Sequence, residues 1–568
     1  MPSLVDHPIG KVAPAVLLVA FFCHLAGCSS SSSATTTSTP PATTVRPPTS
    51  SPSNCRGSHF RLNPSVLQHS YDPVNIQLAE GRQPLAGDTI VFSPKDTPSL
   101  SMLRVLVSAL NGSDGYDVRP VNPRGGGYTV SYRTANGSEV CSTDLTFAQG
   151  DDEPTQAHVT VVGDGNLQVH WVSASSLRGS VSYQRPGTTA PTRYDETSSP
   201  RTYKAQDMCT TPATGQGFRD PGYFHSVTIP NVAQGSTIRI TTGSGTSRAF
   251  TPSPRLVAGD PLRHSVFLVG DLGTTGGGVL GGVSGFGVLQ FPDPDPGRVL
   301  AHVRANEKFR LSIIYGDIAY AGGFSTVWDQ HGEESGSTIG MSYPLVASVG
   351  NHEYVSFNNS EGWYPDFGNY KFPDSGGECG VPFSHRYPVG DGSKANYWFS
   401  FDFGLVHYVM MSTEHNYLNG SAQHQWLADD LASVNRTKTP WVIVTGHRPM
   451  HSPCPFGKFN GEIADALKSD VAPLLKKYKV DLYFTGHLHR YARTPPIDGT
   501  VHLLAGSGRF LESPCSAKGA SPMEKALDIV GYVELDVVGR NELRGTFWGY
   551  NATINEMTVQ DTFAIGNS

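Results

Sequence analysis

The chain has 568 residues and a formal net charge of −7, with 42 Lys and Arg against 49 Asp and Glu. A chain of this length is too long for one hydrophobic core, so two or more domains are expected. The acidic balance gives no electrostatic basis for nucleic-acid binding, which needs a basic surface. Charged residues make up 16%, with 62 Gly and 42 Pro, which favours a loop-rich, β-rich secreted protein over a helical one.

The N-terminal residues 1–28 are typical of a secretory signal. Lys11 precedes an apolar stretch, 12–26, that is short for a membrane span and ends in small residues. Leu25-Ala-Gly-Cys28 resembles the lipobox of bacterial lipoproteins, in which Cys28 would carry a lipid anchor. A plain signal peptide that ends in cysteine is the alternative. No other segment is long and apolar enough for a transmembrane span.

Residues 29–54 are rich in Ser, Thr and Pro and predict a disordered linker, because such a composition cannot form a core. Several Asn-x-Ser/Thr triplets favour a glycosylated eukaryotic protein: Asn111, Asn136, Asn358, Asn419, Asn435 and Asn551. An oxidising compartment would allow disulfides among the cysteines beyond the signal, but the sequence does not choose a pairing. These cysteines are Cys55, Cys141, Cys209, Cys379, Cys454 and Cys515.

Short β-prone runs separated by Asn-Gly and Gly-Asp turns occupy the next two hundred or so residues. The runs include 102–107, 128–132, 158–162, 167–171 and 237–241. Their spacing predicts two β-sandwich modules, 55–160 and 161–258. His158, His170 and His225 are isolated in this part of the sequence, and isolated histidines are usually structural.

From about Pro261 apolar strands alternate with helices. The predicted strands are 265–269, 311–315, 345–349, 406–410, 441–444 and 480–484. Apolar residues recur on one face of two predicted helices, 421–435 and 461–478. This alternation predicts a mostly parallel sheet covered on both faces in a domain spanning 261–528. Residues 529–568 return to short strands and are expected to complete that domain.

Five of these strands end in a glycine followed by polar residues. The clusters are Gly270-Asp271, Gly316-Asp317-Ile-Ala-Tyr320, Gly350-Asn351-His352, Gly446-His447 and Gly486-His487-Leu-His489. Each glycine lets the backbone turn sharply and removes a side chain that would crowd a site. Because parallel strands bring their carboxyl ends to one edge of a sheet, the clusters are expected to converge there.

The donor types of the clusters agree with a metal site. Asp, Asn and His bind divalent and trivalent ions, and a phenolate oxygen adds a preference for Fe(III). We expect Asp317 to bridge two ions and Tyr320 to bind one of them. Two ions that share a carboxylate can catalyse hydrolysis at phosphorus. Each motif alone has an ordinary structural explanation, since Gly-Asp is a common turn and a Tyr near a strand end is usually core.

The five clusters, in this order, resemble the motif blocks of the purple acid phosphatases, a family of metallophosphoesterases. Further stretches are similar to the long plant-type group of that family: 217–225, 373–380, 411–415, 436–441 and 446–450. The resemblance covers about residues 200–566. It implies an α+β multidomain protein. In that fold, N-terminal β-sandwich modules of the fibronectin III kind precede an α/β metallophosphoesterase domain whose sheets are covered by helices.

The resemblance also implies roles for individual residues. Matching the Fe(III) ligands are Asp271, Asp317, Tyr320 and His489. Matching the ligands of a second divalent metal, which is Zn, Mn or Fe(II) in the family, are Asp317, Asn351, His447 and His487. His352 matches a catalytic histidine that contacts the phosphate. The expected cofactors are therefore Fe(III) and a divalent ion, and no ligand position is substituted.

The reaction implied is the hydrolysis of phosphate monoesters at acidic pH, with metal-bound hydroxide as the nucleophile and small-molecule phosphate esters as substrates. Better-known members carry a histidine where this chain has Gly457, so we predict His451 as the acid that protonates the leaving group. The alternative is that His451 is a loop histidine without a catalytic role. An acid that is weaker or lies in a different position would favour substrates with good leaving groups, which depend less on protonation. The first alternative is therefore a phosphodiesterase or nucleotide pyrophosphatase using the same site.

A second alternative is a surface binding protein with an inert metal domain. The expected location is secreted or extracellular, with anchoring at the cell surface if the lipobox is used. The sequence does not indicate an oligomeric state.

Overall fold

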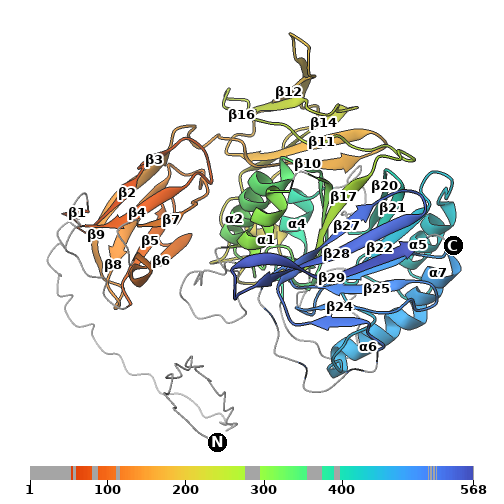
Figure 1. Cartoon of the computed structure of the whole chain (residues 1–568). Coiled ribbons are helices and arrows are strands. Elements are labelled where there is room, and N and C mark those ends of the chain that lie inside the picture. Colours follow the sequence, from red (N-terminus) through yellow and green to blue (C-terminus); the bar gives the residue numbers. More distant parts are fainter. Residues whose placement is uncertain are drawn as a thin grey trace, which may run out of the picture. The chain divides into compact units, whose positions relative to one another are not determined.

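The structure is a computed structural model of the whole chain (Figure 1). It describes residues 53–55, 59–79, 87–110, 115–275, 295–306, 308–354, 374–388, 397–509, 511, 515, 519 and 521–566. The predicted signal, Cys28, most of the linker, Asn111 and Asn358 lie outside the described residues. Within the described part, no helix is both long enough and apolar enough to cross a bilayer.

The first module is a β-sandwich. One sheet has the order β1-β9-β8-β5-β6, with β3 paired to β9, and the other has the order β2-β4-β7. Cys55 and Cys141 form a disulfide in its core. The strands are β1 (Ser53–Asn54), β2 (Phe60–Asn63), β3 (Val66–Leu67), β4 (Val74–Leu78), β5 (Thr89–Pro94), β6 (Leu103–Leu106), β7 (Tyr116–Val118), β8 (Tyr128–Arg133) and β9 (Glu139–Phe147). A 3₁₀ turn, Val107–Leu110, follows β6.

The second module packs a sheet of order β10-β11-β14 against one of order β13-β12-β15-β16. Its core contains Val159, Val169, Trp171 and Ile238. The strands are β10 (Thr155–Val162), β11 (Asn166–Ser173), β12 (Ser180–Gln184), β13 (Thr192–Asp195), β14 (Tyr223–Pro230), β15 (Thr237–Thr241) and β16 (Ser247–Phe250). The predicted boundary between residues 160 and 161 falls inside β10.

Two mixed sheets form the part of the chain from His264 onward. The first has the order β19-β18-β17-β27-β28-β29 and the second the order β20-β21-β22-β23-β25-β24-β26. Strands β17, β18 and β19 are parallel, as are β21, β22, β23 and β25. The prediction of one mostly parallel sheet was wrong, because the antiparallel strands β27, β28 and β29 of the C-terminal segment extend the first sheet through β17.

Six strands of this part of the chain, β17, β18, β19, β21, β22 and β23, lie close to predicted positions, whereas β20, β24, β25 and β26 were not predicted. The strands are β17 (His264–Val269), β18 (Phe309–Tyr315), β19 (Leu345–Ser348), β20 (Phe399–Phe403), β21 (Val406–Met410), β22 (Trp441–Thr445), β23 (Leu482–Thr485), β24 (Tyr491–Arg493), β25 (Val501–Ala505), β26 (Lys525–Leu527), β27 (Gly531–Val537), β28 (Glu542–Asn551) and β29 (Glu556–Gly566).

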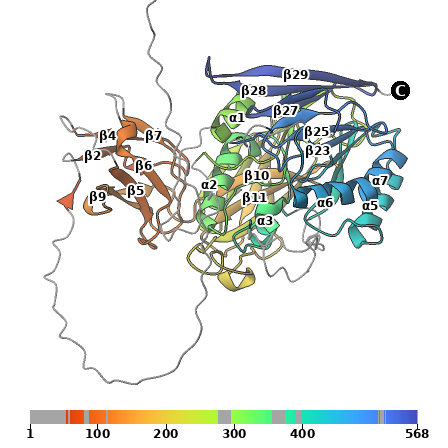
Figure 2. The same cartoon turned by 90° about the horizontal axis from the view of Figure 1, so that it is seen from below.

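Alternate residues of each central strand enter different layers of the core. On β17, Val266 and Leu268 lie between the two sheets, whereas Phe267 and Val269 face the helices on the outer side. A strand buried on both faces needs the continuous apolar run that the sequence shows. Figures 1 and 2 show α1 and α2 on one side of the paired sheets and α5, α6 and α7 on the other. Sheets covered by helices are thus confirmed.

The helices are α1 (Asp295–Arg304), α2 (Ser325–Ser335), α3 (Asn351–Tyr354), α4 (Val381–Arg386), α5 (Ala422–Ser433), α6 (Lys458–Ala466) and α7 (Ala472–Lys477). A π turn, Gly336–Gly340, follows α2, and another, Leu467–Val471, joins α6 to α7. A 3₁₀ turn spans Ala205–Asp207. Further disulfides join Cys209 to Cys379 and Cys454 to Cys515.

Helix α2 is held by arginines from both β modules. The Asp329 carboxylate contacts Arg124 of the first module at 2.6 Å and Arg386 of α4 at 3.1 Å. Glu333 contacts Arg248 of the second module at 2.6 Å. The two carboxylates are 2% and 1% exposed, so these ion pairs are shielded from water. Each β module therefore supplies an arginine that neutralises a buried carboxylate of α2.

Candidate metal centre

The predicted site begins in backbone that bends away from the strand ends. Asp271, Asp317, Tyr320 and His487 have φ angles of 58°, 50°, 53° and 72°. Such left-handed conformations are uncommon for residues other than glycine, and sparsely populated backbone conformations cost about 1–3 kcal/mol each. Four of the seven predicted ligands are therefore held in strained turns, which the surrounding structure must stabilise.

Three predicted Fe(III) ligands meet at the Tyr320 hydroxyl. It donates to Asp271 Oδ1 at 2.9 Å and lies 2.7 Å from His489 Nε2. His489 Nε2 is also 3.2 Å from Asp271 Oδ1. One carboxylate oxygen, one phenol and one imidazole nitrogen, from three separate strand ends, thus face a common point.

The other predicted ligands form a second group. His447 Nε2 lies 3.1 Å from Asp317 Oδ2 and 3.1 Å from Asn351 Oδ1, and His487 Nδ1 lies 2.9 Å from the same Asn351 oxygen. The donor atoms of Asp317, His447 and His487 lie within 4.8 Å of one another, as in a cluster that can hold a metal ion.

Asp317 belongs to both groups. Its Oδ2, which contacts His447, also accepts a hydrogen bond from the Tyr320 hydroxyl at 3.3 Å. A carboxylate that bridges two ions must reach both donor groups at once. The bridging role of Asp317 stays a prediction, and its carboxylate contacts side chains of both groups.

Surrounding contacts orient these donors. His447 Nδ1 donates to the carbonyl oxygen of Tyr315 at 3.2 Å, which leaves Nε2 as the nitrogen facing Asp317. Asn351 Nδ2 donates to Asp374 at 2.9 Å, so its Oδ1 points toward the histidines. Outer contacts of this kind fix the ring orientation and tautomer of metal ligands.

Glu353 joins two of the strand-end turns. Its carboxylate accepts backbone hydrogen bonds from Asp317, Ile318 and Gly350 at 2.8–2.9 Å. Burial and the neighbouring Asp317 raise the pKa of Glu353 to about 8. The sequence placed Glu353 next to the predicted site but gave it no role. The structure shows that it positions Asp317.

At three of the glycines that precede the polar residues there is no room for a side chain. A Cβ on Gly316, Gly350 or Gly486 would come within 3.0 Å of His447, Asp317 or Asp271, respectively. The predicted role of these glycines is confirmed, because the ligands occupy the volume that a side chain would fill.

The charges of the cluster suit positive ions. Burial, then Asp271 and Asp317, raise the pKa of the Tyr320 phenol well above its ordinary value. A phenolate there needs added positive charge. Burial opposes ionisation of Asp317, yet His447 and His352 hold its pKa well below the usual range. Burial likewise opposes the charge on His447, but Asp317 and Asp271 raise its pKa to about 10. The carboxylates of the cluster therefore stabilise positive charge close to them, and its oxygen and nitrogen donors are of the types that bind metal ions.

His352 lies at the edge of the cluster. Its backbone N–H donates to Asp317 Oδ1 at 3.0 Å, and its ring lies 4.4 Å from the Tyr320 ring. The side chain is 28% exposed, more than that of Asp317 or His447, so it can reach a molecule that enters from solvent.

His451 makes its contacts elsewhere. Its Nδ1 lies 3.3 Å from Ser521 Oγ, and its ring packs 4.5 Å from the ring of His502. His451 and His502 line a small pocket with Met450 and Met523. Burial lowers the pKa of His451 to about 4, so this imidazole is mostly neutral in mildly acidic solution.

Arg448, which follows the predicted ligand His447, was given no role from the sequence. Its side chain is buried, forms an ion pair with Glu414 at 2.8 Å and lies 3.1 Å from His487 Nε2. Asn460 Oδ1 is also 3.1 Å from that nitrogen. The Gly-His-Arg-Pro run could have drawn attention to Arg448, but only the fold shows its partners.

Replacing Arg448 with methionine is expected to destabilise the protein by about 3–5 kcal/mol, because it leaves the Glu414 charge buried and unpaired. A double variant, Arg448→Met with Glu414→Leu, should recover part of this loss. Denaturant midpoints of the full chain test this. Equal stability of the single variant and the wild type would contradict the pairing.

The comparisons with known proteins agree with this geometry. Residues 264–491 match the calcineurin-like phosphoesterase family. A solved purple acid phosphatase, PPD1 from yellow lupin (Lupinus luteus) seeds, has the same fold with a TM-score of 0.73 and 22% identity, covering 89% of this chain and 95% of that one. The chain is thus similar to purple acid phosphatases in sequence and in fold, and its residues 264–491 form a calcineurin-like phosphoesterase domain. The resemblance drawn from the strand-end motifs and the predicted fold class are confirmed.

Curated proteins similar to this chain carry different descriptions. "Probable inactive purple acid phosphatase 27" of Arabidopsis thaliana is 29% identical over 395 residues, which is 64% of this chain and 61% of that protein. A "Nucleotide pyrophosphatase/phosphodiesterase" of Hordeum vulgare is 28% identical over 244 residues, 39% of this chain and 64% of that protein. The chain therefore spans less than two thirds of the length of these relatives, and its activity must be argued from its own site.

Proposed function

We propose that this protein hydrolyses phosphate monoesters at acidic pH with two metal ions, Fe(III) and a divalent ion. The observation that supports the proposal most is the position of Asp317, whose carboxylate contacts both donor groups. The full set of donor types argues against an inert metal domain in a surface binding protein.

The chain's own residues define two ion positions. Tyr320, Asp271 and His489 would hold Fe(III), and Asn351, His447 and His487 would hold the divalent ion, with Asp317 shared. When bound, the two ions would supply positive charge that stabilises the phosphoryl group and lowers the pKa of water in the site. Glu353 and Tyr315 keep the ligands oriented through the contacts described above.

His352 is the residue that we assign to the phosphoryl group. It is partly exposed, it stands beside Tyr320 and its Nε2 lies 4.0 Å from Asp317 Oδ2. A protonated imidazole at this edge can donate a hydrogen bond to a phosphoryl oxygen as negative charge develops.

The leaving-group acid bears on the second candidate function, a phosphodiesterase or nucleotide pyrophosphatase. A low pKa and contacts with Ser521 and His502 make His451 a poor proton donor to a departing alkoxide. Substrates with good leaving groups need no such donor. Rates on an alkyl phosphate, a bis-aryl phosphodiester and ATP would separate the two functions.

We also propose that the protein is secreted. Three disulfides in the described residues fit an oxidising compartment. The predicted glycosylation sites Asn136, Asn419 and Asn435 are exposed. Mass spectrometry of the mature N-terminus and of glycopeptides would test secretion, glycosylation and lipidation of Cys28.

The wild-type protein is expected to contain iron and to show a visible phenolate-to-iron absorption band that Tyr320→Phe abolishes. Phenylalanine keeps the ring beside His352 and Arg509 but removes the oxygen that contacts Asp271 and His489. Tyr343→Phe, which removes a hydroxyl bonded to a backbone carbonyl, is the control and should keep the band. An iron-free protein, or an unchanged band in Tyr320→Phe, would refute the proposed site.

A further inference from the structure

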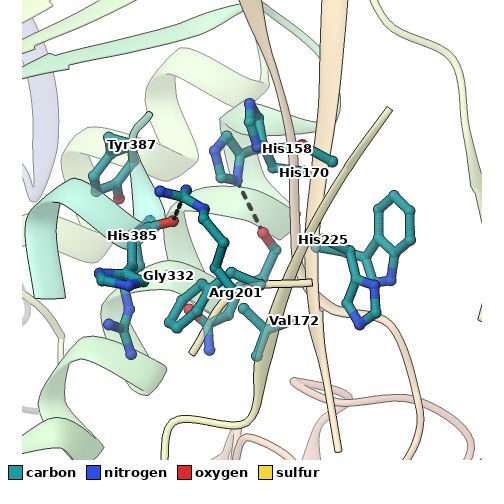
Figure 3. Close-up of a pocket in the computed structure, with 13 residues that line it drawn as sticks. His158, His170, Val172, Arg201, His225, Gly332, His385 and Tyr387 are labelled. Carbon is teal, nitrogen blue, oxygen red and sulfur yellow. Dashed lines mark hydrogen bonds between the residues drawn. The ribbon is translucent and has the colours of Figure 1, made fainter. Parts of the chain in front are cut away.

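A pocket of about 410 Å³, counting the part open to solvent, lies where the second β module meets α2 and α4. Its walls come from β10, β11 and β14 of the module, from Gly332 of α2 and from His385 and Arg386 of α4. Figure 3 shows the rings of His158 and His170 stacked on one side, with centroids 5.0 Å apart. Among its lining residues are none of the seven predicted metal ligands.

The described lining of the pocket contains two arginines and four histidines but no carboxylate. Arg201 is exposed and reaches the carbonyl oxygen of His385 at 3.3 Å, a contact drawn as a dashed line in Figure 3. No carboxylate of the described residues forms an ion pair with Arg201, and a carbonyl oxygen carries no full charge to offset the guanidinium.

The carboxylates that contact lining residues already have basic partners, and Glu333, which accepts from the backbone N–H of Gln156, pairs with Arg248. Asp329 is shared between Arg386 and Arg124, so one carboxylate faces two guanidinium groups. Glu196 contacts His225 Nδ1 at 2.9 Å, on the ring that stacks with Trp171. The balance of fixed charge around the pocket is therefore positive.

Two buried histidines supply unused hydrogen-bonding capacity. His158 and His170 are 7% and 5% exposed. In the part of the chain that the structure describes, their Nε2 atoms have no hydrogen-bond partner. Burial of such an atom without a partner costs about 1–3 kcal/mol. A ligand with acceptor oxygens would remove this penalty at His170.

The pKa values of two lining histidines are lowered by burial and, in addition, by positive charge nearby. Burial, then His158 and Arg201, lower the pKa of His170 well below its ordinary value. Burial, and then the charges of Arg201 and Arg386, lower the pKa of His385 to about 4. An anion in the pocket would offset the repulsion that the arginines exert on a proton added to either histidine.

We propose that this pocket binds a small oxyanion of the size of orthophosphate, with Arg201 at its mouth and His170 at its base. Arg201 supplies a charge-assisted hydrogen bond, and His170 donates from Nε2. The inference is independent of the proposed hydrolysis, because it uses different residues. It also revises the reading of His158 and His170 as merely structural.

The test is equilibrium binding of orthophosphate to the full chain carrying Asp317→Asn, which weakens phosphate binding at the proposed metal centre. One phosphate per chain is expected to remain bound. Adding Arg201→Gln should weaken it at least about tenfold, since a charge-assisted hydrogen bond is lost. Arg201→Lys should keep most of the affinity.

The matched control is Arg239→Gln, which removes an exposed arginine from β15 and should leave binding unchanged. Saturable binding that Arg201→Gln leaves intact would overturn the proposal, as would the absence of binding in the Asp317→Asn chain. Neither result bears on hydrolysis, which is measured separately in the wild-type chain.

Discussion

Replacing Asp317 with asparagine is expected to lower kcat/KM for an aryl phosphate by on the order of 1000-fold. Asparagine keeps the shape of the side chain but removes the negative charge and turns one oxygen into a donor. The Oδ2 atom that contacts both Tyr320 and His447 can then no longer serve both groups. We also expect the metal content per chain to fall.

The control for this variant is Asp429→Asn on the exposed side of α5, which makes the same chemical change far from any predicted ligand. Activity and metal content should match those of the wild type there. Activity of Asp317→Asn within a few-fold of the wild type would show that Asp317 does not bridge two ions.

Replacing Gly316 with alanine is expected to remove both stability and activity. Gly316 has φ of +92°, where an L side chain costs about 1–2 kcal/mol. Its Cβ would also lie within 3.0 Å of the His447 ring, and overpacking of this kind costs about 1–3 kcal/mol more. The His447 ring would have to move away from Asp317, which it must contact to share a metal ion.

Gly499→Ala separates the two effects. Gly499 also has φ of +92°, but nothing lies within 4 Å of the position of its Cβ. Its denaturant midpoint should fall only by the cost of placing an L residue at positive φ, and its activity should be unchanged. If the two alanine variants lose equal stability and Gly316→Ala stays active, the close packing of Gly316 against His447 has no functional importance.

The ligand clusters could be predicted because their signal is local. An apolar run, a glycine and a polar residue follow one another within a few positions at Val269-Gly270-Asp271 and again at Tyr315-Gly316-Asp317. The rule that parallel strands share an edge then brings such clusters together without knowledge of any contact.

What the sequence could not supply is mostly long-range. Glu353 binds the backbone of Asp317 across 36 positions, and Arg448 pairs with Glu414 across 34. Neither pairing produces a periodic pattern in the sequence from which it could have been predicted. The mixed character of the first sheet was missed for the same reason, since β27 pairs antiparallel with β17 across more than 260 residues, as in the pairing of His264 with Val537.

Helix α2 also limits where this chain can be divided. Trimming the gene at residue 261 would leave Asp329 with one of its two arginines and Glu333 without Arg248, so two shielded acids would be exposed or uncompensated. The smallest autonomous unit for expression is then the entire segment after the linker. Evolutionary shuffling that exchanged either N-terminal module would have to preserve its arginine.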